Sequence, residues 1–129
     1  MRFLHTSITV GDIDRSLAFY TGVLGLTFER RRKIPENHAE IAFVLDPASG
    51  SRVELTCWEG KTAITAGEQL DHLAFEVPDL EAVLATARAK GVRVAKEPYR
   101  LAGGSHRIAF LMDPDEVWIE LIERPPGTD

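Results

Sequence analysis

The sequence predicts an α+β fold built from two tandem βαβββ modules, and an internal repeat is the first observation behind this prediction. The segment IAFVLDP at 41–47 returns as IAFLMDP at 108–114, and His5 returns as His72, both at an offset of 67 residues. A fixed offset shared by separate features indicates that one structural unit occurs twice. The second observation is that both halves show the same order of strand-like and helix-like patterns.

The chain length sets the expected domain organisation. A chain of 129 residues fits one domain, and a module of roughly 60 residues supports a core poorly by itself. We therefore expect one domain over 1–124, whose modules pack together or pair across subunits. Its expected parts are the modules 1–60 and 69–124, the linker 61–68 and the tail 125–129.

Charge and composition argue against several classes of protein. The formal net charge of −5 disfavours a nucleic-acid binder, because phosphate contacts need a basic face. No apolar run is long enough to cross a bilayer, so no membrane partner is expected. Cys57 is the only cysteine, and the N-terminus lacks a signal-peptide pattern. These features favour a cytoplasmic protein.

The first module begins with an alternating segment over residues 3–10, which predicts a half-buried strand with His5 on its more polar face. Asp12 then fits the N-cap of an amphipathic helix that stops at Gly25. Three further strands are expected at 26–33, 39–45 and 52–58, with a turn at 46–50 between the last two.

The second module repeats this order. A strand is expected at 72–77, closed by Pro78, and a helix capped by Asp79 should run to Gly91. The remaining strands are expected near 92–97, 107–112 and 117–123.

Strand alternation predicts where four candidate metal ligands point. Glu54 shares a strand face with Thr56 and Trp58, and Glu120 shares one with Trp118 and Ile122. If the apolar faces receive the helices, both glutamates and both repeated histidines lie on the other face. Two imidazoles and two carboxylates there favour a divalent transition metal. Each residue alone has an ordinary alternative as a solvated strand side chain, but its recurrence in both modules favours metal binding.

The chain resembles the vicinal oxygen chelate superfamily and, within it, the lactoylglutathione lyases (glyoxalase I). The resemblance runs from Leu4 to Glu123 and rests on LHTSITVGDIDRSLAFYTGVLGL, IAFVLDP, VELT, DHLAFEV and IAFLMDPDEVWIELIE. It implies a cupped mixed sheet around a metal, and homodimers whose sites take modules from different chains. The family's four metal ligands correspond to His5, Glu54, His72 and Glu120.

The resemblance also implies a reaction. Such enzymes isomerise the hemithioacetal of methylglyoxal and glutathione to the lactoyl thioester through a metal-stabilised enediolate, so a small molecule is the expected partner. One divalent ion per site is implied, with Ni²⁺ or Co²⁺ favoured and Zn²⁺ possible. Glu120 is the expected base, with Glu54 the second candidate.

Substrate contacts depart from the family pattern. Thr9 stands where bacterial lyases carry an arginine that engages glutathione, and no asparagine follows VELT. Losing one charge-assisted contact typically costs about 1.5–3 kcal/mol, which predicts a weaker grip on glutathione. A cation of the 30–33 cluster or Arg107 is a candidate substitute. Further candidates are Trp58 and Trp118, as a pocket wall or as packing, and the pair Gly103 and Gly104, which resembles a substrate-side loop.

Two other functions on this scaffold remain open from the sequence. The first is another metalloenzyme of the superfamily, either an epimerase or an Fe²⁺ dioxygenase. Dioxygenases usually need only three protein ligands, and epimerases commonly carry glutamine at the position of Glu54. The second is a drug-binding protein without metal, like the bleomycin-resistance proteins. Retention of all four ligands disfavours each of these alternatives.

Overall fold

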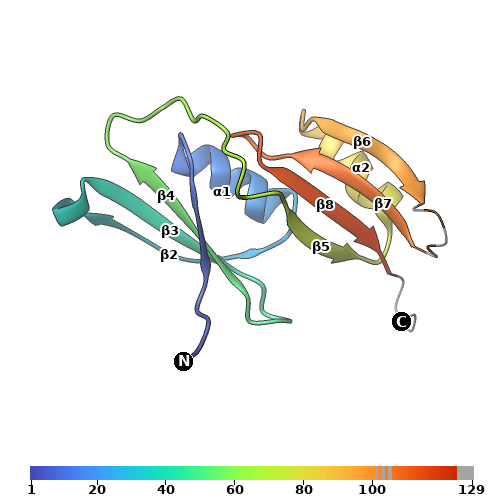
Figure 1. Cartoon of the computed structure of the whole chain (residues 1–129), viewed down its shortest axis with the longest axis horizontal. Helices are drawn as coiled ribbons and strands as arrows, with labels where there is room; N and C mark the ends of the chain where they lie inside the picture. Colours follow the sequence, from blue (N-terminus) through green and yellow to red (C-terminus); the bar gives the residue numbers. More distant parts are fainter. Residues whose placement is uncertain (101, 103, 105, 125–129) are drawn as a thin grey trace. The chain divides into compact units, whose positions relative to one another are not determined.

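The computed structural model describes residues 1–100, 102, 104 and 106–124. The chain divides into two compact units, Met1–Thr65 and Ala66–Asp129. Each unit has the element order βαβββ, and each contains a mixed four-stranded sheet. The predicted α+β fold is therefore confirmed, and Figure 1 labels its elements.

The first unit has the strand order β1-β4-β3-β2. Strand β1 runs parallel to β4, whereas the β4–β3 and β3–β2 pairs are antiparallel. Its elements are β1 (Thr6–Thr9), α1 (Ile13–Gly22), β2 (Thr27–Ile34), the short 3₁₀ helix η1 (Pro35–Asn37), β3 (Ala39–Leu45) and β4 (Arg52–Trp58). The structure thus reproduces the predicted bounds of the third and fourth strands.

The second unit repeats this topology with the order β5-β8-β7-β6. Strand β5 is parallel to β8, and the β8–β7 and β7–β6 pairs are antiparallel. Its elements are β5 (Leu73–Val77), α2 (Leu80–Ala89), β6 (Val94–Arg100), β7 (Arg107–Met112) and β8 (Trp118–Glu123).

Both helices begin at the aspartates that the sequence indicated. The Asp12 carboxylate accepts a hydrogen bond from the Arg15 backbone N–H at 2.9 Å, and the Asp79 carboxylate accepts one from the Ala82 N–H at 3.1 Å. Each bond satisfies one of the free N–H groups of a first helical turn. Helix α1 ends at Gly22, before the predicted stop, and Gly25 follows with a φ of 76°.

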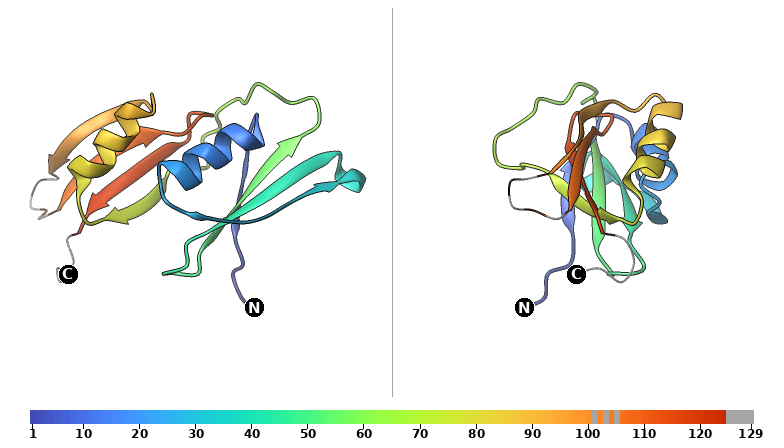
Figure 2. Two further views of the ribbon diagram at one scale, coloured as in Figure 1. Left: turned by 180° about the vertical axis from the view of Figure 1, so that it is seen from behind. Right: turned by 90° about the vertical axis from the view of Figure 1, so that its right-hand side faces the viewer.

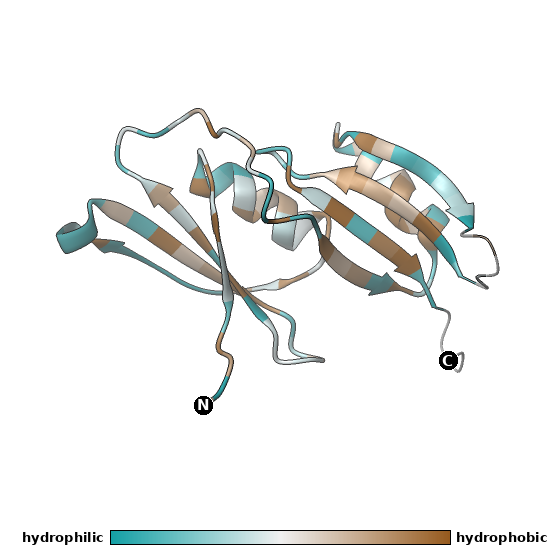
Figure 3. Cartoon of the chain, viewed as in Figure 1, coloured by the Kyte–Doolittle hydropathy of each residue, from teal (hydrophilic) through white to brown (hydrophobic). Residues whose placement is uncertain are grey.

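Each helix covers the apolar face of its own sheet. Helix α1 packs against β3 and β4, and α2 packs against β6, β7 and β8 (Figures 1 and 2). Leu55, Ile119 and Leu121 are completely buried, as expected for the strand faces opposite Glu54 and Glu120. Figure 3 shows mostly hydrophobic colour along β7, alternating hydrophobic and hydrophilic bands along β8, and mostly hydrophilic colour on β6, which forms one edge of the second sheet.

Strands β1 and β6 differ most from the sequence prediction. Strand β1 begins at Thr6 rather than residue 3, and Phe3 and Leu4 are exposed. Strand β6 starts later than predicted, at Val94, and continues through Pro98 to Arg100. A proline fits there because β6 is an edge strand, and its pairing with β7 shifts register between Lys96 and Tyr99.

No helix in the described part of the chain has the length and apolar character needed to cross a membrane. The predicted tail at 125–129 lies outside the described residues.

Candidate metal centre

The first unit places a histidine beside a glutamate. Ser7 of β1 lies opposite Glu54 of β4, so His5, two residues earlier, lies on the same side as Glu54. The His5 Nε2 and Glu54 Oε2 atoms are 3.9 Å apart, and these side chains are 32% and 19% exposed. An imidazole nitrogen and a carboxylate oxygen are therefore close together and accessible from solvent.

The second unit builds an equivalent pair. Ala74 of β5 lies opposite Glu120 of β8, and His72 immediately precedes β5. The His72 Nε2 and Glu120 Oε1 atoms are 3.6 Å apart, and these side chains are 34% and 17% exposed. Both pairs thus have the same origin in the topology, a parallel pairing between the first and fourth strands of a module.

The His72 ring has a further partner. Its Nδ1 atom lies 2.7 Å from Oδ1 of Asp71. A carboxylate that accepts the Nδ1–H bond fixes the imidazole tautomer and leaves the Nε2 lone pair available for a metal ion. Leu4 occupies the corresponding place before His5.

A phenylalanine and a cation accompany each pair. Of these four residues, only Arg30, as part of the basic cluster at 30–33, was a site candidate from the sequence. The Phe43 ring meets His5 edge-on with centroids 5.0 Å apart, and Arg30 Cζ lies 4.6 Å from the Phe43 centroid. The Phe110 ring likewise meets His72 at 6.0 Å, and Lys96 Nζ lies 5.7 Å from the Phe110 centroid.

Cross-strand register creates this arrangement. Arg30 pairs with Phe43 and Lys96 pairs with Phe110, each next to a register shift. Such irregularities redirect side chains. The phenylalanines carried a sequence signal, because both belong to the repeated IAF motif.

The donor set fits a divalent transition ion. Each pair offers one imidazole nitrogen and one carboxylate oxygen, which are ligand types used by zinc and by nickel. Among the residues that the structure describes, no single group gathers three or more His, Cys, Asp or Glu side chains able to hold an ion. Each pair by itself supplies two protein donors.

The two tryptophans lie on the glutamate-bearing faces without being buried. Trp58 is 41% exposed and Trp118 is 36% exposed. The Trp118 and Phe110 rings meet edge to face, with centroids 5.4 Å apart. Trp118 also lines a cavity of about 270 Å³ together with Asp71, Lys96 and Phe110. Trp118 therefore adjoins the surroundings of His72 rather than the core.

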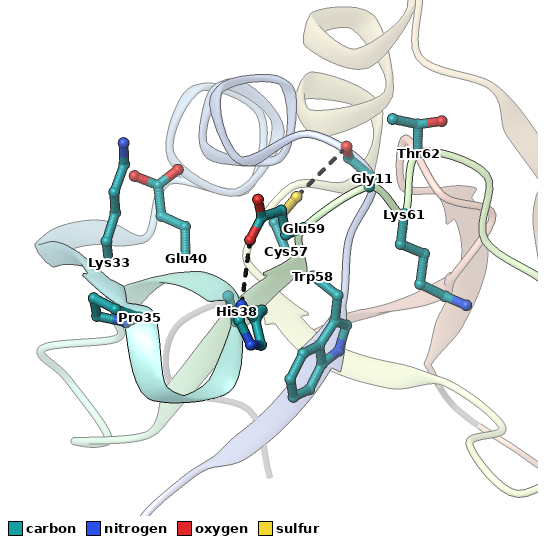
Figure 4. A pocket seen from close by; sticks show the side chains of 12 residues that line it. Gly11, Lys33, Pro35, His38, Glu40, Cys57, Trp58, Glu59, Lys61 and Thr62 are labelled. Carbon is teal, nitrogen blue, oxygen red and sulfur yellow. Dashed lines mark hydrogen bonds and ion pairs between the residues drawn. The ribbon is translucent and has the colours of Figure 1, made fainter.

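A larger cavity of about 470 Å³ lies in the first unit around the end of β4. Trp58 forms part of its wall, and the Lys33 and Lys61 side chains border it (Figure 4). The exposed His38 Nδ1 and Glu59 Oε2 atoms, which belong to residues lining this cavity, lie 3.6 Å apart. Thr9 is half-buried in β1 and, by alternation, shares the face of His5.

Arg107 faces the helix side of its sheet instead of the glutamate side. Its guanidinium donates hydrogen bonds to Glu123 at 3.0 and 3.2 Å and to Glu81 of α2 at 3.0 Å. Arg107 lowers the pKa of the Glu123 carboxyl, and a bond from the Leu80 backbone N–H lowers it further. Arg107 therefore anchors α2 to β8.

Of the predicted loop pair, Gly104 is exposed, and Gly103 lies outside the described residues.

Comparison with known proteins gives consistent matches over the chain. A profile described as the Glyoxalase/Bleomycin resistance protein/Dioxygenase superfamily matches residues 2–121. The chain is 40% identical to a lactoylglutathione lyase of Haemophilus influenzae over 125 residues, which cover 95% of this chain and 93% of that protein. It is 41% identical to a lactoylglutathione lyase of Arabidopsis thaliana over 127 residues, which cover 97% of this chain and 45% of that protein.

A solved structure of the trypanothione-dependent glyoxalase I of Leishmania major superimposes with a TM-score of 0.80. The sequences are 35% identical, and the match covers 95% of this chain and 86% of that one. The chain spans about half the length of the plant relatives that it matches.

Proposed function

Because the chain belongs to the glyoxalase, bleomycin resistance protein and dioxygenase superfamily, we propose that it is a metal-dependent lyase of the glyoxalase I type. The observation that carries this proposal is the repeated His–Glu pair, present at equivalent strand positions in both units. Relatives about 40% identical over almost their whole length are lactoylglutathione lyases, which supports the same activity for this chain.

In this proposal His5, Glu54, His72 and Glu120 together hold one divalent ion. The enzyme is a homodimer in which the first pair of one chain joins the second pair of the other. Two observations support a dimer. Phe3 and Leu4 expose apolar surface directly beside His5. The plant relatives have about twice the length of this chain, enough for two copies in one polypeptide.

The reaction moves one proton between neighbouring carbons of a methylglyoxal hemithioacetal. When bound, the ion would act as a Lewis acid toward the substrate. Glu120 takes the proton from the carbon that bears sulfur and returns it to the next carbon, while the hydroxyl proton of the first carbon passes to the oxygen of the second, which gives the lactoyl thioester. Glu54 is the second candidate for this task. His5 and His72 act as ligands, and their edge contacts with Phe43 and Phe110 help to fix the rings.

The thiol half of the substrate is proposed to be glutathione, as in the relatives' names. Thr9 offers no positive charge to a glutathione carboxylate, whereas the cavity beside Trp58 has Lys33 and Lys61 at its border. Trp58 shares a strand face with Glu54, so a bound tripeptide can extend along this face. One relative of similar fold is trypanothione-dependent, which makes the thiol a variable part of this reaction.

We further propose Ni²⁺ or Co²⁺ as the ion, with Zn²⁺ as the alternative, and methylglyoxal detoxification in the cytoplasm as the role. One cysteine permits no intrachain disulfide, in keeping with a reducing compartment. The net charge of −5 supports a small-molecule partner rather than nucleic acid.

The direct test measures metal and turnover separately. Protein purified without added metal is analysed for its elements, stripped, and reloaded with Ni²⁺, Co²⁺ or Zn²⁺. Formation of the lactoyl thioester from methylglyoxal and glutathione is then followed, with trypanothione in a parallel assay. We expect turnover in at least one metal form and none in the stripped protein. Drug binding by the stripped protein, with no turnover by any metal form, would instead identify a binding protein.

A further inference from the structure

The two glutamates differ in the residue that follows two positions later on the same strand face. Thr56 follows Glu54, whereas Ile122 follows Glu120. Their partners on the neighbouring parallel strand differ in the same way, since Ser7 pairs with Glu54 and Ala74 pairs with Glu120. The first unit thus has two hydroxyl groups where the second has only hydrocarbon.

The two hydroxyls form a chain of hydrogen bonds that ends on Glu54. Thr56 Oγ1 donates to Glu54 Oε1 at 3.0 Å, and Ser7 Oγ lies 2.9 Å from Thr56 Oγ1. A hydroxyl has one proton to donate. Because Thr56 donates its proton to Glu54, Ser7 must donate to Thr56. The two bonds therefore run in one direction and polarise each other toward the carboxylate.

This chain of bonds acts on one oxygen of Glu54 and leaves the other for the metal centre. Oε1 accepts the threonine bond, whereas Oε2 is the atom near His5 Nε2. Thr56 is only 6% exposed although it lies on the glutamate face, so little water competes for its hydroxyl. The Glu54 carboxylate is thereby held with Oε2 turned toward His5.

We propose that Thr56 and Ser7 are positioning residues that fix Glu54 as a metal ligand, while Glu120 is free to reorient. This inference rests on the proposed function, because it explains how two equivalent carboxylates divide the tasks of ligand and base. A ligand that keeps one geometry retains the ion, whereas a base must swing between the ion and the substrate carbon. Residues that hydrogen-bond a metal ligand typically change metal affinity by about 10–100-fold when they are replaced.

The test titrates the metal-free protein with Ni²⁺ alone and measures the binding affinity by calorimetry. Thr56→Val keeps the shape of the side chain and removes its hydroxyl, so we expect Ni²⁺ to bind about 10–100-fold more weakly. Thr56→Ser restores the donor and should bind nearly as tightly as wild type. Ser7→Ala should lie between them. The matched control is Ile122→Val, at the equivalent place beside Glu120, which should leave Ni²⁺ affinity unchanged.

A serine variant that binds as weakly as the valine variant would overturn the proposal, because packing rather than the hydroxyl would then matter. Equal affinity of wild type and Thr56→Val would overturn it as well. Thermal unfolding of the stripped proteins identifies any variant that does not fold, in which case Ser7→Ala decides.

A converse variant places the missing hydroxyl in the second unit. Ile122→Thr offers Glu120 the bond that Glu54 has, so kcat should fall while Ni²⁺ affinity stays the same or rises. An unchanged kcat would contradict the need for a mobile Glu120. The affinity measurements remain valid if the wild type fails to convert the hemithioacetal. In that event the proposed function is wrong, and the Ni²⁺ titrations alone test whether Thr56 and Ser7 position Glu54.

Discussion

The two units carry the same His–Glu pair, but a neighbouring side chain hydrogen-bonds the glutamate in the first unit and the histidine in the second. In the first unit Thr56 hydrogen-bonds the carboxylate of Glu54, whereas no hydroxyl occupies the equivalent position beside Glu120. In the second unit Asp71 lies against the imidazole of His72, whereas Leu4 precedes His5. A repeated scaffold can thus preserve two ligand pairs while their neighbours diverge. We propose that this difference lets the two glutamates take different tasks.

The largest expected difference concerns the two glutamates. Glutamine has the shape of glutamate but cannot accept the substrate proton. Glu120→Gln at saturating Ni²⁺ should therefore lose at least about 10²-fold in kcat, and Glu54→Gln should lose mainly metal affinity. Steady-state kinetics with the metal content of each sample measured beforehand separates the two effects. Near-normal turnover in Glu120→Gln together with an inactive Glu54→Gln would reverse the two assignments.

The second prediction concerns pairing of units from different chains. His5→Ala and His72→Ala should each be inactive alone. Unfolding and refolding an equal mixture should restore about one quarter of wild-type activity, because half of the dimers are mixed and each has one intact site of two. No recovery in the mixture, with dimers present by sedimentation, would mean that each chain completes its own site.

A smaller effect, on KM, is expected from substitution of Thr9, whose equivalent in the second unit is Glu76. Thr9→Arg introduces a cation on the His5 face, where it can pair with a glutathione carboxylate. A charge-assisted bond of this kind should lower KM for the glutathione hemithioacetal about tenfold. Thr9→Gln, which has no charge, is the matched control. A wild-type KM already in the low micromolar range would show that other residues, such as Lys33 and Lys61, bind the tripeptide.

The smallest effect concerns stability rather than activity. Arg107 lowers the pKa of Glu123, so this pair stabilises the fold above the usual glutamate pKa and stops doing so as pH falls through the lowered value. Arg107→Met should reduce the free energy of unfolding at pH 7, and the difference from wild type should shrink as pH falls below the usual glutamate pKa. Urea unfolding at several pH values measures this. Arg93→Met, which removes an exposed contact with Glu116, is the control, and an equal pH dependence in both variants would contradict the assignment.

The repeat made much of this fold predictable from sequence. Strand periodicity and helix capping depend on residues close together in the sequence. The structure accordingly has the predicted strands at 39–45 and 52–58 and both capping aspartates. Alternation also placed Glu54 and Glu120 opposite the buried faces. The same rule, applied along β7, would have shown that Arg107 and Phe110 point to opposite sides.

The surroundings of the ligands were not predictable, because they depend on pairing between distant strands. The Ser7–Thr56 bond joins residues 49 positions apart and exists only because β1 pairs with β4 in one register. The positions of Arg30 and Lys96 over their phenylalanines depend on irregular pairing at edge strands. Sequence spacing reports neither the partner strand nor its register.

Above all, we propose that the two His–Glu pairs bind one ion together. The most direct measurement is the number and affinity of Ni²⁺ ions bound by stripped wild type, His5→Ala and His72→Ala. We predict one ion per chain in wild type and a severe loss of affinity in both variants, since each removes one donor of a shared four-ligand set. Undiminished Ni²⁺ binding by the folded His72→Ala protein would contradict this account.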